Sequence, residues 1–474
     1  MKNKFIDFFK QNWWILIIFA LLVARNLFYN SIINIVHSPD LGYHIFLSDI
    51  YRQNPKTIFF WNVDDIQIGC HNNKSIDSRV LLNPFLYHSV IGKIWFLTEK
   101  LGEGSAYQIT SLIQSIFGLL TIFYVYLLAK LITKNKLIHL LSVIIIANLP
   151  MFSFISNYLS YDNLINLLSI MSIYYFFKYL KEKNPKNLIL LGIFMMLGGL
   201  TKIAFGPLIL ILLFLLLINK KFNLTFLVKD FIAGFKNKKN LITVSFFILI
   251  SVLFISFYGR NLLLFNKILP NRISFRLVSC PIEKVKINLN TKDKLAIKEE
   301  TTNSENIKEI IKKTPKKPLS FLSYFKKWQI TMMAHSVNIV SHRSLVKDDW
   351  INKFYYIGIY ISILAIILQI IKRNKTVINL FLIGFLYTAY YFYHIYSSYK
   401  KSLIFEAAVQ GRYVFPIIGA LIVATSYSLL QPIKNKILKI LIVLIISAFL
   451  IYFDFFWFLS HYKTWYSLPP LKLF

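Results

Sequence analysis

Apolar runs long enough to cross a bilayer recur from one end of this 474-residue chain to the other, with polar segments between them. A helix needs roughly 20 apolar residues to span the hydrocarbon core, so the pattern predicts an all-α, polytopic membrane protein of about 11 transmembrane helices. The predicted helices cover residues 13–36, 107–132, 137–155, 164–180, 187–202, 203–219, 241–258, 351–371, 377–396, 413–430 and 439–459. The first run is kept as a helix because it is too long for a signal-peptide core and lacks a small-residue cleavage site.

Lysine and arginine are distributed unevenly between these runs. If the N-terminus is cytoplasmic, the lysine clusters between the runs fall in cytoplasmic segments and the short outer segments carry few, as the positive-inside rule requires. The C-terminus and two long segments, 37–106 and 259–350, then lie outside. Of the 21 Asp and Glu residues, only Asp7, Glu182 and Asp230 fall on the cytoplasmic side, which indicates that carboxylates are used on the outer face. We expect a multi-pass protein of a cell membrane, taken to be a bacterial inner membrane.

The two long outer segments differ in character. The first contains an apolar piece, Val80 to Leu97. We interpret it as a helix lying on the membrane, because a spanning helix there would move every later lysine cluster outside. The second segment is polar and lysine-rich, and its composition leaves open whether it is an extracytoplasmic loop or a small cap. Each segment holds one cysteine, Cys70 and Cys280, and whether these pair also stays open.

Composition restricts the partners. Hydrophobic residues make up 56% of the chain and aromatic residues 17%, and the formal net charge is +33. In a soluble chain such a charge would suggest nucleic acid, but in a membrane protein the positive-inside rule and anionic headgroups account for it. We therefore expect membrane lipids as partners and no nucleic acid.

A candidate binding motif opens a late helix, in the run Gln410-Gly411-Arg412-Tyr413-Val414-Phe415-Pro416. The guanidinium of Arg412 can hold two phosphate oxygens at once. Gly411 lets the backbone turn, and Pro416 is tolerated in the first helical turn. The motif therefore predicts a clamp for a lipid phosphate, and the alternative is an ordinary snorkelling anchor.

Three further charged residues lie at predicted outer helix ends. Asp40 follows a proline beyond the first helix, where a partly desolvated carboxylate is a candidate general base. Asp162 lies where the third helix ends and the fourth begins. For both acids the alternative is an N-cap, which aspartate forms well. Lys202 ends the fifth helix, and its alternative is a snorkelling side chain.

Arg25 and Asp454 lie inside predicted helices. An arginine within a span is costly unless it is paired or reaches water, so it indicates function. A pair between the two residues is conceivable, although the depths expected for them differ by several positions.

The order of these elements resembles that of the GT-C superfamily of membrane glycosyltransferases. An aspartate follows helix one, then come a proline-led surface helix, an acid between helices three and four, a Leu-Thr-Lys after helix five, and a Gly-Arg-Tyr that opens a late helix. The similarity extends over residues 13–430 and is greatest to the protein mannosyltransferase and aminoarabinose transferase branch and related bacterial membrane proteins. It implies an enzyme that takes a sugar from a polyprenyl-phosphate donor on the outer leaflet and transfers it to a glycan, lipid or protein acceptor.

The resemblance also implies roles for single positions. Asp40 matches the catalytic aspartate of the first outer loop, with Leu41 where many members have a second acid. Pro84 matches one proline of a His-Pro-Pro element, in which Asn83 and Phe85 replace the other two residues.

The remaining matches are substrate-binding positions. Lys202 and Arg412 match the basic residues that face the carrier phosphate. Asp162 matches the acid of the second outer loop, which is structural or, in some members, associated with a metal. The full predicted substrate-binding set is His44, Asp162, Lys202, Arg412 and Tyr413.

The implied reaction is a direct displacement with inversion at the anomeric carbon. Asp40 would take the proton of the acceptor hydroxyl while Lys202 and Arg412 stabilise the leaving phosphate. Such a leaving group needs no metal, and few side chains have ligand spacing, so we predict no metal and no cofactor besides the lipid-linked sugar phosphate, which is the substrate. The catalytic module is expected in 13–258, which includes the outer loop 37–106. It follows a cytoplasmic N-terminus, 1–12, and precedes the outer segment 259–350 and a C-terminal transmembrane module, 351–474.

Two other functions stay open. A non-catalytic transporter of lipid-linked oligosaccharides should line a central cavity with charges at helix midpoints, whereas most candidate groups here lie at the outer rim. A polysaccharide polymerase or ligase acts on lipid-linked glycans at the same face and is harder to separate. The sequence does not specify the sugar, the acceptor or the length of the carrier.

Overall fold

The computed structural model describes residues 2–32, 40–60, 83–219, 223–269, 318–337, 339–341, 344–345, 349–403, 405, 409–457 and 459. Within these residues the regular secondary structure is helical except for one short antiparallel pair of strands, β1 (Ile339–Ser341) and β2 (Ser344–Leu345). Cys70, Cys280 and the part of the predicted cap at 270–317 lie outside the described residues, so their pairing and structure stay predictions.

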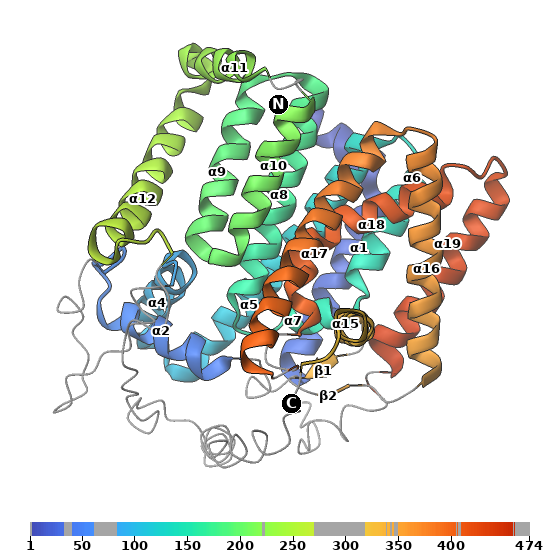
Figure 1. Cartoon of the computed structure of the whole chain (residues 1–474), viewed down its shortest axis with the longest axis horizontal. Coiled ribbons are helices and arrows are strands. Elements are labelled where there is room, and N and C mark those ends of the chain that lie inside the picture. Colours follow the sequence, from blue (N-terminus) through green and yellow to red (C-terminus); the bar gives the residue numbers. More distant parts are fainter. Residues whose placement is uncertain are drawn as a thin grey trace.

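The long helices run side by side in one bundle (Figure 1). They are α1 (Lys2–Ile32), α5 (Glu103–Ile132), α6 (Lys136–Ala147), α8 (Tyr161–Glu182), α9 (Pro185–Thr201), α10 (Gly206–Asn219), α12 (Leu241–Phe265), α16 (Asp349–Ile371), α17 (Lys375–Ser402), α18 (Phe415–Leu430) and α19 (Lys436–Ile451). The shorter elements are α2 (Leu41–Gln53), α4 (Leu86–Thr98), α7 (Pro150–Ile155), α11 (Leu224–Lys236), α15 (Phe321–Val337), the 3₁₀ turns η2 (Glu99–Leu101), η3 (Ile203–Phe205), η4 (Lys238–Asn240) and η7 (Gly411–Val414), and the π-helical turn η8 (Tyr452–Trp457).

Each predicted run contains a helix, but the count of eleven spans is not confirmed. Six described helices are long and apolar enough to cross a membrane, or seven if α10 and α11, bent by 108°, form one span. Three shorter apolar helices lie at 13–29, 136–147 and 185–201. The predicted span 137–155 is divided into α6 and α7 because Pro150 begins a new helix after the non-helical Asn148 and Leu149.

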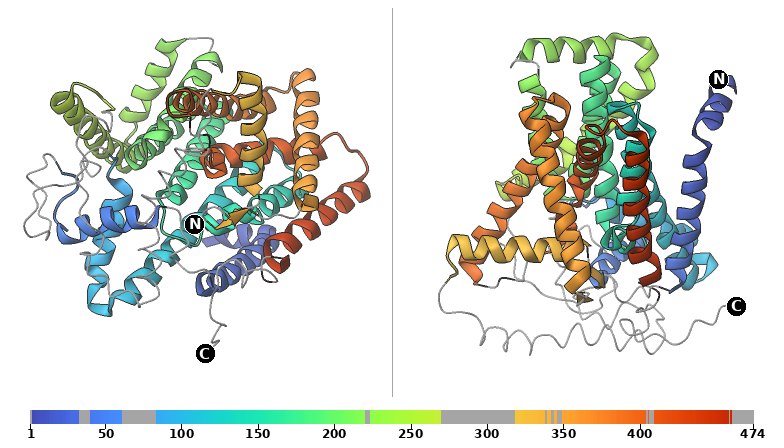
Figure 2. Two further views of the ribbon diagram at one scale, coloured as in Figure 1. Left: turned by 60° about the horizontal axis from the view of Figure 1, so that its bottom comes forward. Right: turned by 90° about the vertical axis from the view of Figure 1, so that its right-hand side faces the viewer.

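The two ends of the bundle carry different elements. α11 and the start of α1 lie at one end, and α2, α4, α7 and α15 lie at the opposite end (Figures 1 and 2). The surface helix expected at 80–97 corresponds to α4, which packs against α2. The two cross closely at Gly92, where an added Cβ would lie 2.3 Å from the carbonyl oxygen of Ser48. We infer that glycine is required there, because any side chain would push α2 away from α4.

Arg25 and Asp454 form an ion pair, with 2.6 Å between Nη1 and Oδ2. The depths expected from the sequence had spoken against this pair. The expected depths were wrong because α1 begins at Lys2 rather than at residue 13 and ends at Ile32. Arg25 therefore lies closer to the C-terminal end of its helix than predicted, beside the π-helical turn that holds Asp454.

The predicted topology can be tested with single cysteines placed on a background without Cys70 and Cys280. We expect a membrane-impermeant maleimide to label Lys56→Cys and Ser323→Cys in intact cells, because both positions lie in the long outer segments. Lys238→Cys should be labelled only after the membrane is permeabilised, which serves as the accessibility control. Labelling of Lys238→Cys in intact cells would place the site described below on the cytoplasmic face.

Candidate active site

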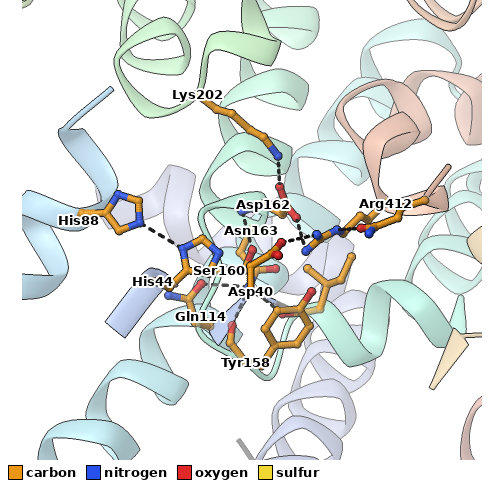
Figure 3. A network of polar contacts seen from close by, with 12 residues as sticks. Asp40, His44, His88, Gln114, Tyr158, Ser160, Asp162, Asn163, Lys202 and Arg412 are labelled. Atoms are coloured by element: carbon orange, nitrogen blue, oxygen red, sulfur yellow. Dashed lines mark hydrogen bonds and ion pairs between the residues drawn. The ribbon is translucent and has the colours of Figure 1, made fainter. Parts of the chain in front are cut away.

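Four segments that are far apart in the sequence meet at one end of the bundle (Figure 3). Asp40 directly precedes α2, and Asp162 lies in the first turn of α8. Lys202 caps the C-terminus of α9, and Arg412 lies in η7, which leads into α18. The structure therefore brings together the acids and cations that the sequence selected.

The four charged groups form one chain of ion pairs. Arg412 Nη2 lies 2.6 Å from Asp40 Oδ2, and Arg412 Nη1 lies 3.4 Å from Asp162 Oδ2. Lys202 Nζ contacts the other oxygen of Asp162 at 2.7 Å. Asp162 thus lies between the two cations, and Arg412 lies between the two acids.

The two acids differ in exposure. The side chain of Asp162 is 6% exposed and that of Arg412 3%, whereas that of Asp40 is 46% exposed. Burial alone would raise the pKa of Asp162, but Lys202 and Arg412 outweigh it and hold the pKa below its ordinary value. Asp162 is therefore a fixed buried anion that orients both cations, and Asp40 is the carboxylate that an incoming molecule can reach.

The capping alternative is contradicted for both acids. Asp40 occupies the N-cap position of α2 but makes no side-chain capping bond, and its φ of 59° is left-handed. Aspartate tolerates that conformation better than most residues do. At α8 the capping side chain is Ser160, which accepts a hydrogen bond from the backbone N–H of Asp162. Both carboxylates are instead directed at cations.

Aromatic rings surround the two cations. Lys202 Nζ lies 4.2 Å from the ring centre of Tyr161 and 5.0 Å from that of Tyr413. Arg412 lies 5.4 Å from the ring centre of Tyr413, and its Nε donates to Gln410 at 2.7 Å. These cation–π contacts, the burial of Arg412 and the partial burial of Lys202 are not those of snorkelling side chains.

A buried histidine pair lies beside Asp162. His44 Nδ1 and His88 Nε2 are 3.1 Å apart, and the edge of the His44 ring meets Tyr161. Burial is the main cause that lowers the pKa of His44 to about 3; the charge of Asp162 opposes this shift, and those of Arg412 and Lys202 add to it. Burial also lowers the pKa of His88. Both rings are therefore neutral at physiological pH.

His88 was not predicted as a site residue, nor was a second polar row behind Asp162. In that row Asn163 donates to Gln114 at 2.9 Å, and Gln114 donates to the hydroxyl of Tyr87 at 2.8 Å. His88 gave a weak signal in the sequence. It lies two residues after Leu86 in the predicted surface helix, where a histidine among apolar neighbours is unusual. Gln114 had none, because a lone glutamine inside an apolar run does not indicate where it faces.

The histidine pair makes a pH prediction. A histidine whose folded pKa lies below its ordinary 6.5 contributes stability that is fully present above pH 6.5 and is lost as the pH falls toward about 3. In that window each such histidine lowers the free energy of unfolding by up to about 1.4 kcal/mol for each pH unit. We expect the melting temperature of the purified protein to fall between pH 6.5 and 5, and His44→Gln to flatten that slope. His394→Gln, which replaces an exposed histidine, should leave the slope unchanged; an unaltered slope in His44→Gln would contradict the prediction.

No group of three or more His, Cys, Asp and Glu side chains in the described part of the chain is arranged to hold a metal ion. The predicted absence of a metal stays a prediction. The charges that the described site offers to a substrate are those of Arg412 and Lys202.

The described residues form an apolar helical bundle with acids and cations gathered together, and its long apolar helices are those of a multi-pass membrane protein. Residues 94–255 match the family model described as dolichyl-phosphate-mannose-protein mannosyltransferase. The match runs from α4 into α12 and includes Asp162 and Lys202, but not Asp40 or Arg412. It confirms the resemblance predicted from the motifs and indicates a membrane glycosyltransferase of the GT-C type. No curated protein matches the chain.

Proposed function

We propose that this protein transfers a sugar from a polyprenyl-phosphate donor to an acceptor hydroxyl at the outer face of the membrane, with inversion. The observation that carries the proposal is the alternation of two acids and two cations, in which Arg412 is buried between Asp40 and Asp162 and only Asp40 is half exposed. A phosphate leaving group requires fixed cations, and an acceptor hydroxyl requires a reachable base.

In the proposed step, Asp40 removes the proton of the acceptor hydroxyl. The acceptor oxygen forms a bond to the anomeric carbon, and the bond between that carbon and the phosphate oxygen breaks. The polyprenyl phosphate leaves with the bonding electrons, and its negative charge is stabilised by Arg412 and Lys202. Asp162 is not consumed, since it keeps both cations in place.

Arg412 already uses one face of its guanidinium on Asp40. A donor phosphate that binds Arg412 would replace the carboxylate of Asp40 at Nη2. Donor binding would then release Asp40 to accept the proton of the acceptor. This exchange makes the base available only once the donor is bound.

The rival functions make different demands. A polymerase or ligase also needs a base and cations at the outer face, and it differs in the size of the donor glycan. A transporter needs no base at all. Purified protein given polyprenyl-phosphate monosaccharides should release polyprenyl phosphate only with a suitable acceptor. Release from lipid-linked oligosaccharides alone would indicate the polymerase or ligase, and movement of lipid without release would indicate the transporter.

A further inference from the structure

Arg25 and Asp454 are buried charged groups that the proposed chemistry does not use. Their side chains are 10% and 1% exposed, and they join α1, the first helix, to η8 near the end of the described chain. Isolated charges in this environment are expensive, so a buried pair is kept where its hydrogen bonds serve other groups.

The pair lies at the break between α6 and α7. Arg25 Nη1 donates to the carbonyl oxygen of Ala147 at 2.7 Å and to Asn148 Oδ1 at 3.3 Å. Ala147 ends α6, where carbonyls lack helical partners. On the other side of the break, the hydroxyl of Ser153 in α7 lies 3.0 Å from Asp454 Oδ2. The ion pair therefore satisfies polar groups on both sides of the break.

The polar contacts continue from α7 toward the site. Asn157 donates to the carbonyl oxygen of Ser153 at 2.6 Å and accepts from Ser115 at 3.2 Å. Asn163 donates to the carbonyl oxygen of Ile155 at 2.7 Å. These bonds fix residues 156–160, whose last member, Ser160, caps α8 two residues before Asp162.

We propose that Arg25 and Asp454 are positioning residues, which hold the α6–α7 break so that the 156–160 segment places Asp162 between Lys202 and Arg412. The Ser153 hydroxyl also lies 3.1 Å from the carbonyl oxygen of Ala147. An apolar pair of the same size would fill the space and leave that contact, but it would remove the bonds of Arg25 to Ala147 and Asn148 and the contact of Asp454 with Ser153. The structural part of the inference stands apart from the proposed function, and its kinetic part rests on it.

Hydrogen exchange on the purified protein tests the structural part without any substrate. Asp454→Asn should speed amide exchange in residues 147–163 about tenfold or more and leave residues 185–219 unchanged. The matched control is Asp230→Asn, which also removes a carboxylate bonded to another element, the Tyr179 hydroxyl at 2.6 Å, but at the opposite end of the bundle. Equal exchange of residues 147–163 in the two variants would overturn the inference. If Asp454→Asn does not fold, Ser153→Ala carries the same test, because it removes one link and keeps the ion pair.

Kinetics test the link to the site. If Asp454 acts through Asp162, Asp454→Asn should lower kcat/KM for the sugar donor at least tenfold. The double variant, Asp454→Asn with Asp162→Asn, should then have a kcat/KM little below that of Asp162→Asn alone. If the loss of kcat/KM in the double variant equals the product of the two single losses, Asp454 acts elsewhere and this part of the inference is overturned. If Asp454→Asn exchanges faster but the unsubstituted protein transfers no sugar, the proposed function is refuted and the structural role of the ion pair remains.

Discussion

Asp40→Asn should reduce sugar transfer about 10²- to 10⁴-fold, the usual contribution of a general base. The amide keeps the shape of the side chain but cannot take the proton of the acceptor. The KM for the donor should stay the same or fall, because a donor phosphate no longer competes with a carboxylate for Arg412. The measurement is release of polyprenyl phosphate at saturating acceptor, together with donor KM.

Glu99→Gln is the matched control for Asp40→Asn. Glu99 is also an exposed carboxylate beside a helix end, and it also pairs with an arginine, Arg52, at 2.8 Å. It lies outside the chain of ion pairs at the site, so its loss should leave transfer at the parental rate. Transfer at the parental rate by Asp40→Asn itself would reduce Asp40 to a ligand of Arg412.

Arg412→Lys should weaken donor use by about 10- to 150-fold, which corresponds to a charge-assisted contact of about 1.5–3 kcal/mol. A guanidinium reaches Asp40 and Asp162 through two different nitrogens, and an ammonium is a single point charge that cannot bridge them. The loss should appear in kcat/KM for the donor and in binding of the carrier lipid.

Arg52→Lys is the control for that substitution, since Arg52 also contacts two acids, Asp49 at 2.6 Å and Glu99 at 2.8 Å. Its side chain is 31% exposed and the pairs are therefore screened by solvent, so lysine should substitute with little effect. Near-normal donor use by Arg412→Lys at matched expression would remove Arg412 from the phosphate site.

Much of the site could be predicted because its residues lie at helix ends, and helix ends are visible in an apolar pattern. Asp40, Asp162, Lys202 and Arg412 were each found beside a hydrophobic run. What the pattern could not give was their mutual distance, since tertiary packing alone decides that Arg412 lies between the two acids. The same limit explains why the N-cap alternatives could not be dismissed without seeing Ser160 and the backbone of Asp40.

Helix positions were predicted better than helix lengths and breaks. The break after Ala147 was missed because apolar residues continue across it and only Pro150 marks it. The start of α1 was missed because charged residues interrupt the apolar ones in its first turns, from Lys2 to Lys10. This error also hid the pair between Arg25 and Asp454. The buried row of His88, Gln114 and Asn163 could not be found from one sequence, because isolated polar residues in apolar runs do not reveal which face of a helix they occupy.

The ion pairs of the site also set the order in which it can be completed during synthesis. Lys202 follows Asp162 by 40 residues, which at 5–20 residues per second is about 2–8 s. Arg412 follows Asp40 by 372 residues, or about 20–75 s. Asp162 therefore gains Lys202 as a partner soon after it is made, while Asp40 gains Arg412 only once η7 has been made. A chain that stops before η7 would hold the pair of Asp162 with Lys202 and lack both contacts of Arg412, so a closed site reports that the chain has been made nearly to its end.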